Sequence, residues 1–279
     1  MRLLLGIFAV GTGLALALGT AGPDLQGVAF RAVKAVPSRP GYPLPVNGLD
    51  AQGIRSLAQA RYEEAADSFT RSLRLVPGNP GALANRGTAF LALDRLEEAM
   101  SDYALALELE PGLGRVLAHP LSRAHVRRAQ RRMDEGETRG AEEDLRAALR
   151  YDPDFGPAYS ELSVLAFKGK DTAGCLDLAE RALALEGSVP EALANKAACL
   201  AWSGRLREAL AELERAAALE PGRAELHASM AGVLSRMGEA GPAREKAVKA
   251  VELEPRLREA LAPILYSRTA SIRPPGATR

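Results

Sequence analysis

The side chains best suited to chemistry are few in this chain, and they form no known catalytic or metal-binding pattern. The three histidines are His119, His125 and His227, and none has a spacing to cysteine or carboxylates that is typical of a metal site. There is no glycine-rich phosphate loop and no Gly-x-Ser-x-Gly motif. The glutamates follow helix surfaces, where a solvated face explains them. We therefore predict a non-enzymatic protein without metal or cofactor.

The only two cysteines are Cys175 and Cys199. Both occupy small, inward positions, Cys175 in the second helix of one predicted hairpin and Cys199 in the first helix of the next. Neighbouring helices of a stack touch, so a disulfide is geometrically possible outside the cytoplasm. The alternative is a pair of buried free thiols that pack as small hydrophobic side chains.

Positive charge is concentrated in one stretch, LSRAHVRRAQRRMD at 121–134, which carries five arginines and one histidine. The formal charge of the whole chain is only +1, so the chain as a whole has no electrostatic footprint for nucleic acid. A nucleic-acid-binding role would depend on this cluster alone, and we expect no such role. The function of the cluster depends on the helices that position it.

The first residues differ from the rest of the chain. After Arg2 no charged residue occurs before Asp24, and this apolar run is long enough to span a bilayer as a helix. Its end, GTA before Gly22, also fits a cleavable signal peptide. A soluble helix in a core is the remaining alternative. Both leading alternatives place the remainder of the chain outside the cytoplasm, and prolines between 23 and 45 indicate a spacer.

From residue 46 the chain repeats itself. Alanine and leucine dominate while aromatic residues make up 5%, which favours helices. Within each repeat, apolar residues recur at three- and four-residue spacing in two blocks, and a proline commonly ends the second block, so each repeat is a helical hairpin. Three positions of every repeat hold small residues: Gly53, Gly87, Ala129, Ser163, Ala197 and Ala231; Ala65, Ala99, Ala141, Cys175, Ala209 and Ala243; Ser72, Ala106, Ala148, Ala182, Ala216 and Ala250.

This small–large–small–proline pattern on a 34-residue period resembles the tetratricopeptide repeat, most closely in NRGTAFLALDRLEEAMSDYALALELEP and NKAACLAWSGRLREALAELERAAALEP. The resemblance implies an all-α, right-handed superhelical solenoid of six helical hairpins with a C-terminal capping helix. The third repeat starts eight residues late, through either a longer loop or a longer helix. The predicted segments are a signal or anchor (1–22), a spacer (23–45), repeats at 46–79, 80–113, 122–155, 156–189, 190–223 and 224–257, an insert (114–121), a capping helix (258–268) and a disordered tail (269–279).

The resemblance also implies a concave groove, lined by the first helices, that binds a peptide or a partner's helix. In the groove positions of family members that grip a C-terminal carboxylate, this chain has Asn85, Arg123 and Arg127, whereas Asp50 and Ile54 depart from that pattern. A carboxylate clamp and a looser site for an acidic partner are the two alternatives. Further groove positions hold Phe167, Lys168, Asn195 and Trp202.

Two of these expectations leave alternatives open. Trp202, the sole tryptophan, either anchors a partner or packs over the adjacent turn. Arg128 and Arg132 fall where the fold favours apolar side chains, so we expect their stems to extend outward or the helix to be rotated or loosely packed.

The combined prediction is an exported, non-enzymatic protein-binding scaffold or assembly factor of the cell envelope, in the periplasm or at the outer face of the inner membrane. The alternative is a regulatory subunit of an envelope enzyme or secretion complex. Its partner would be a protein or peptide, with the membrane as a further partner if the N-terminal segment is retained.

Overall fold

The structure, a computed structural model, describes residues 8–10, 13–15, 44–186 and 189–266. Nearly all of the predicted spacer, most of the segment 1–22 and the whole of the predicted tail lie outside these residues. The chain divides into two compact units. We call Pro23–Glu161 the first unit, and Leu162–Arg279 with Met1–Gly22 the second unit.

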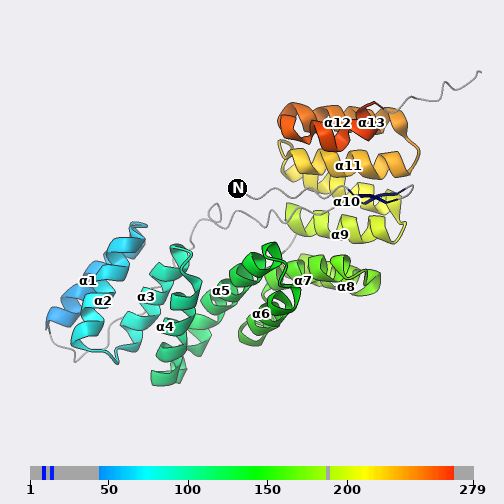
Figure 1. Cartoon of the computed structure of the whole chain (residues 1–279). Helices are drawn as coiled ribbons and strands as arrows, with labels where there is room; N and C mark the ends of the chain where they lie inside the picture. Colours follow the sequence, from blue (N-terminus) through cyan, green and yellow to red (C-terminus); the bar gives the residue numbers. More distant parts are fainter. Residues whose placement is uncertain (1–7, 11–12, 16–43, 187–188, 267–279) are drawn as a thin grey trace, which may run out of the picture. The chain divides into compact units, whose positions relative to one another are not determined.

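The first unit is a stack of three helical hairpins in chain order (Figure 1). Its core is a continuous cluster of leucine, alanine and aromatic side chains contributed by successive hairpins, including Phe69, Leu91 and Tyr103. The helices are α1 (Leu44–Ala58), α2 (Tyr62–Leu75), α3 (Pro80–Ala92), α4 (Leu96–Leu109), α5 (Gly114–Asp134) and α6 (Thr138–Tyr151), and α7 (Gly156–Lys168) begins in this unit.

The second unit continues with hairpins of the same kind. Its helices are α8 (Thr172–Glu186), α9 (Pro190–Trp202), α10 (Leu206–Leu219), α11 (Ala224–Arg236), α12 (Ala240–Leu253) and the short α13 (Arg258–Leu265). Buried side chains of α9, α10 and α11 form one cluster, and those of α11, α12 and α13 form another. The all-helical repeat fold predicted from the sequence is therefore confirmed.

The small residues of the repeat are the positions where two helices of a hairpin meet. Every residue of the three sets is buried. A Cβ added to Gly53 would lie 2.6 Å from the Phe69 ring, and one added to Gly87 would lie 2.9 Å from the Tyr103 ring. Larger side chains there would push the paired helices apart, because the interior is already close-packed. This contact explains why the period of the sequence is visible at small residues.

Each turn between the two helices of a hairpin contains one residue in the left-handed region of φ. These residues share one place in the repeat, and three of them are not glycine, although this backbone region favours glycine. They are Ala60, Asp94, Gly136, Lys170, Gly204 and Gly238, with φ between 55° and 83°. The turn therefore has the same geometry throughout, whether or not the local residue suits it.

The eight-residue insert lengthens a helix, which settles one alternative left open by the sequence. A 3-10 turn at Pro111–Leu113 leads directly into α5, which spans 21 residues and includes the whole insert. Pro120 lies inside this helix and is buried. The first helix of the third hairpin therefore extends about two turns further than its equivalents.

Of the predicted signal or anchor segment, the structure describes two three-residue strands, β1 (Phe8–Val10) and β2 (Gly13–Ala15). They pair antiparallel, with Phe8 opposite Ala15. Among the described residues, no helix has both the length and the apolar character needed to cross a bilayer. The remainder of the segment lies outside the described residues, so the choice between signal and anchor stays a prediction.

Candidate functional site

The arginine-rich helix α5 turns much of its positive charge toward one buried carboxylate. Asp144 of α6 has a side chain only 3% exposed. Arg128 donates to it from Nε at 2.9 Å, Arg132 donates from Nη1 at 2.6 Å, and His125 Nδ1 lies 2.9 Å from Oδ1. Since a carboxylate only accepts hydrogen bonds, Nδ1 must carry the imidazole proton. Three residues of α5 thus converge on one acceptor.

These contacts set the ionisation of Asp144. Burial alone would raise its pKa, but hydrogen bonds from His125 and Arg128, together with the charges of Arg128 and Arg132, outweigh burial and lower the pKa to about 2. The Arg128 pKa is raised, because the hydrogen bond to Asp144 outweighs burial. The carboxylate is therefore held ionised as a structural acceptor within the hairpin.

Of the alternatives for Arg128 and Arg132, the outward extension of their stems is wrong. Both side chains are half-buried and bind Asp144, which supplies an ionic partner at the place where the fold usually has apolar packing. The same arrangement occurs one hairpin earlier, where Arg86 of α3 makes a bidentate ion pair with Asp102 of α4, at 2.7 Å for both bonds. A half-buried cation bound to a buried carboxylate is thus a recurring feature inside these hairpins.

Two other arginines of α5 bind the end of a neighbouring hairpin's first helix. Arg127 Nη1 donates to the Leu91 carbonyl at 2.8 Å and lies 3.6 Å from Asp94. Arg131 donates to the Asp94 carbonyl and carboxylate, both at 3.2 Å. The C-terminal carbonyls of a helix lack intrahelical donors and carry partial negative charge, so cations there are favourable. These two arginines therefore fasten α5 to α3.

The three predicted carboxylate-gripping residues have different surroundings. Asn85 on α3 is buried, Arg127 is bonded to α3, and Arg123 is half-buried with its Nη2 3.4 Å from His119 Nε2. Burial lowers the pKa of Arg123, and the charge of Arg127 lowers it further. Burial and the Arg123 charge also lower the pKa of His119, partly offset by Asp152 at 3.7 Å. This arrangement does not present the three side chains as one open grip.

In the second unit the predicted groove residues include an aromatic pair in which Trp202 is exposed and Phe167 is half-buried. Phe167 near the end of α7 and Trp202 at the end of α9 meet edge to face, with ring centroids 5.5 Å apart. Trp202 nevertheless keeps 41% of its surface exposed. Lys168 beside Phe167 is exposed, and Asn195 on α9 is half-buried. Trp202 therefore packs against Phe167 and still keeps a large part of its surface exposed.

The two cysteines lie directly beside this aromatic pair. Cys175 of α8 and Cys199 of α9 are joined as a disulfide in the structure, with Cα atoms 5.8 Å apart. Both are buried in a small cluster with Ala179, against which Phe167 packs. The disulfide therefore links two successive hairpins next to Phe167.

Sequence reasoning missed the ion pairs inside the hairpins. The available signal was a spacing: Arg86 precedes Asp102 by 16 residues, and Arg128 precedes Asp144 by the same interval. A third pair with this spacing, Lys196 and Glu212, lies 3.1 Å apart between α9 and α10. Among the described residues, no group of three or more histidines, cysteines and carboxylates could hold a metal ion.

Comparison with known proteins agrees with this architecture. Residues 51–113 and 126–190 match the tetratricopeptide repeat family. No curated protein matches the chain.

Several solved structures have a similar fold. YrrB, a TPR protein with an unusual peptide-binding site, is 23% identical over 71% of this chain and 98% of its own, with a TM-score of 0.53. PilF of Pseudomonas aeruginosa is 16% identical over 78% and 97%, with a TM-score of 0.56. A tetratricopeptide repeat protein of Parabacteroides merdae is 18% identical over 79% and 88%, with a TM-score of 0.55. At these identities the likeness concerns the fold. The small-residue period and the stacked hairpins show a fold of helical hairpins like those of tetratricopeptide repeats, and residues 51–113 and 126–190 match that family.

Proposed function

We propose that the chain is a non-enzymatic scaffold that binds a protein or peptide partner through the surface formed by Phe167, Lys168, Asn195 and Trp202. The observation that carries this proposal is the exposure of Trp202, held edge to face against Phe167 on a disulfide-linked support. Tryptophan is among the residues that most often dominate binding energy at protein interfaces. YrrB, which shares the fold, has a peptide-binding site.

The chemistry of this surface indicates the partner's character. An apolar side chain would cover the Trp202 ring, and Lys168, which is exposed and follows Phe167 in the sequence, would favour a carboxylate on the same partner. The surface does not depend on the arginines of α5, most of whose guanidinium groups are bonded within the first unit. A short peptide or helix with one large apolar residue near an acidic group or C-terminus fits these features.

Affinity capture with crosslinking, comparing Trp202→Ala with the unmodified chain, tests this proposal. Leu219→Ala on α10 is the matched control, because Leu219 is also a large apolar residue, 53% exposed, in the same unit. We expect Trp202→Ala to lose a partner that the control retains. A set of bound proteins that is the same for both variants would refute the proposed surface.

A cell-envelope location is the second part of the proposal, and it rests on the uncharged apolar run between Arg2 and Asp24. A reporter that is active only outside the cytoplasm, fused after residue 279, would be active with the full chain. Deletion of residues 3–22 should abolish its activity. Equal activity of the two fusions would contradict export.

A further inference from the structure

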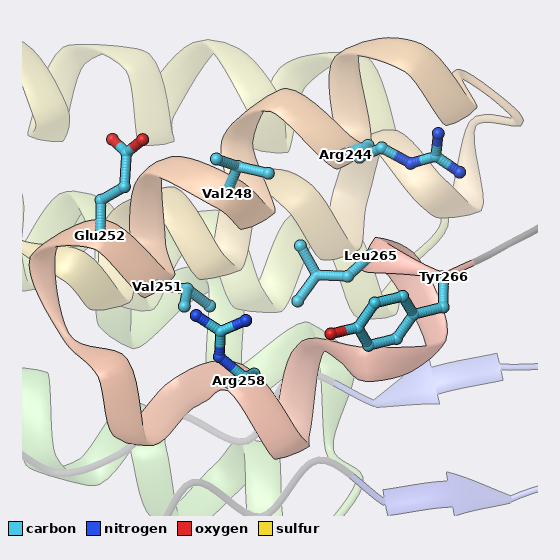
Figure 2. Close-up of a pocket in the computed structure, with 7 residues that line it drawn as sticks. All are labelled: Arg244, Val248, Val251, Glu252, Arg258, Leu265 and Tyr266. Carbon is cyan, nitrogen blue, oxygen red and sulfur yellow. The ribbon is translucent and has the colours of Figure 1, made fainter.

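One face of α12 carries a short stripe of residues with opposite charges at its two ends. Arg244, Val248 and Glu252 are spaced four residues apart, so they lie on one side of the helix. Val248 is 43% exposed and Glu252 is exposed, while Arg244 is half-buried. Figure 2 shows the three along α12 above the facing helix α13. The stripe borders an open groove of about 290 Å³, also lined by Val251, Arg258, Leu265 and Tyr266.

Only the first position of this stripe is covered in the preceding hairpin. Leu210 of α10 lies 34 residues before Arg244, at the same place in the repeat, and packs against the cluster formed by α11, α12 and α13. After α12 the described residues contain a 3-10 turn at Pro255–Leu257 and the eight-residue α13, and a groove between α12 and α13 stays open. At this place of the repeat α12 carries a charged residue where α10 carries an apolar one.

We propose that this face of α12 binds a second copy of the same chain. In a two-fold dimer with antiparallel α12 helices crossing at Val248, each Arg244 faces the partner's Glu252, and the two valines meet at the axis. The order positive–apolar–negative is complementary to itself only in this antiparallel arrangement. Charge complementarity of this kind selects the partner and its orientation.

The neighbouring positions agree with this arrangement. The same two-fold axis sets the exposed Glu245 and Lys249 opposite Val251 and Ala247, which are uncharged and buried in their own chain, so these two positions add no contact between like charges. Within the chain, Glu252 has a 3.9 Å contact with Lys249, an exposed pair of a kind that contributes little to stability. The exposed ring of Tyr266 and the half-buried Leu265 extend the apolar surface beside the valine. The contact surface is thus an apolar centre with an ion pair at each side.

A charge-swap experiment tests the dimer. The full chain, measured by sedimentation equilibrium over a wide concentration range, should dimerise. Arg244→Glu sets two glutamates opposite each other at both ends of the interface, and Glu252→Arg sets two arginines there. Each single variant should therefore dimerise at least roughly tenfold more weakly. An equimolar mixture of the two variants should recover the association, because each glutamate then faces an arginine.

Crosslinking at the two-fold axis gives an independent measurement. Val248→Cys should form an intermolecular disulfide under mild oxidation, whereas Val116→Cys on α5, a valine of equal exposure at 44%, should not. Circular dichroism melting verifies that each variant is folded. A chain that stays monomeric would overturn the proposal. So would single variants that dimerise as well as the unmodified chain, a mixture that fails to recover association, or equal crosslinking at both positions.

Discussion

At Asp144, three side chains of α5 converge on one buried carboxylate, so the loss of its charge should affect the whole hairpin. Asp144→Asn removes the ionic partner of Arg128 and Arg132 and leaves their guanidinium groups partly desolvated. We expect it to lower the free energy of unfolding by about 2 kcal/mol or more. Chemical denaturation measures this loss. Glu142→Gln, which removes an exposed i,i+4 pair with Arg146, is the control and should change stability little.

The lowered pKa of Asp144 also predicts a pH dependence. Its pKa is about 2 in the folded chain against 3.8 ordinarily, so the unfolded chain binds the proton more readily. The stabilisation is fully present above about pH 4 and is lost as the pH falls toward 2, and its size is about 2 kcal/mol. Melting temperatures measured between pH 5 and 2 should fall more steeply for the unmodified chain than for Asp144→Asn. Parallel curves would contradict this assignment.

Arg127 on α5 should contribute more to stability than an exposed arginine such as Arg139. Arg127→Ala removes a charged hydrogen bond to the Leu91 carbonyl and should cost about 1–2 kcal/mol of stability. Arg139→Ala, on the exposed start of α6, should cost much less. Urea unfolding of the two variants measures the difference. Equal stability of the two would show that Arg127 does not hold α5 to α3.

At the residue scale the sequence predicted which side chains are unusual but not their partners. Helical periodicity predicts that Arg128 and Arg132 lie on an inward face, and in the structure both contact Asp144. Because periodicity describes one helix at a time, it could not indicate that Asp144 of the next helix would be their partner. Asn85 was placed in the groove by its repeat position, yet it is buried. The burial of a side chain depends on the neighbouring helices, and the position of a residue within one repeat gives no information about them.

At the scale of the element, the left-handed turn residues give a direct stability test. Ala60 and Gly204 occupy the same turn position, with φ of 55° and 81°. Ala60→Gly should stabilise the chain by up to about 1 kcal/mol, because glycine adopts this conformation without strain, and Gly204→Ala should destabilise it by a similar amount. Thermal unfolding measures both effects. Shifts of the same sign in the two variants would contradict the shared geometry.

The disulfide belongs to the same scale, because it connects α8 to α9. A titration of thiols in denatured, unreduced protein should find none, and two would show that the cysteines are free. Cys199→Ala should lower stability by up to about 3 kcal/mol through loss of the cross-link across 24 residues. The fluorescence of Trp202, the sole tryptophan, should respond, since Phe167 packs on both Trp202 and the cysteine cluster. Ala194→Ser on α9 is the control, because it changes a residue of the same helix and leaves both cysteines in place.

The elements themselves were largely predictable. A 34-residue period in small residues is a strong signal, because each small residue marks a helix contact that tolerates little extra volume. The conformation of the eight-residue insert could not be predicted, since a longer loop and a longer helix are both compatible with the sequence GLGRVLAHPL. Pro120 in particular argued against the continuous helix that α5 forms. Tertiary packing of the buried Leu117 and Leu121 overrides that local preference.

At the scale of the whole molecule, the described repeats form a framework of helical hairpins on which several large apolar side chains are exposed. In the first unit most of the arginine charge of α5 is used between helices, whereas in the second unit Trp202 remains accessible. The stripe on α12 is a different surface from the aromatic pair. Binding of a partner at Trp202 and self-association through α12 are therefore independent and can be measured separately.

Site-specific crosslinking tests the central claim most directly. A photoreactive residue replacing Lys168, beside the aromatic pair, is compared with the same residue replacing Leu219 on α10. We predict a specific adduct from position 168 that is absent from position 219 and is lost when Trp202→Ala is added. Identical adducts from both positions, or an adduct that survives Trp202→Ala, would contradict the claim that this surface binds the partner.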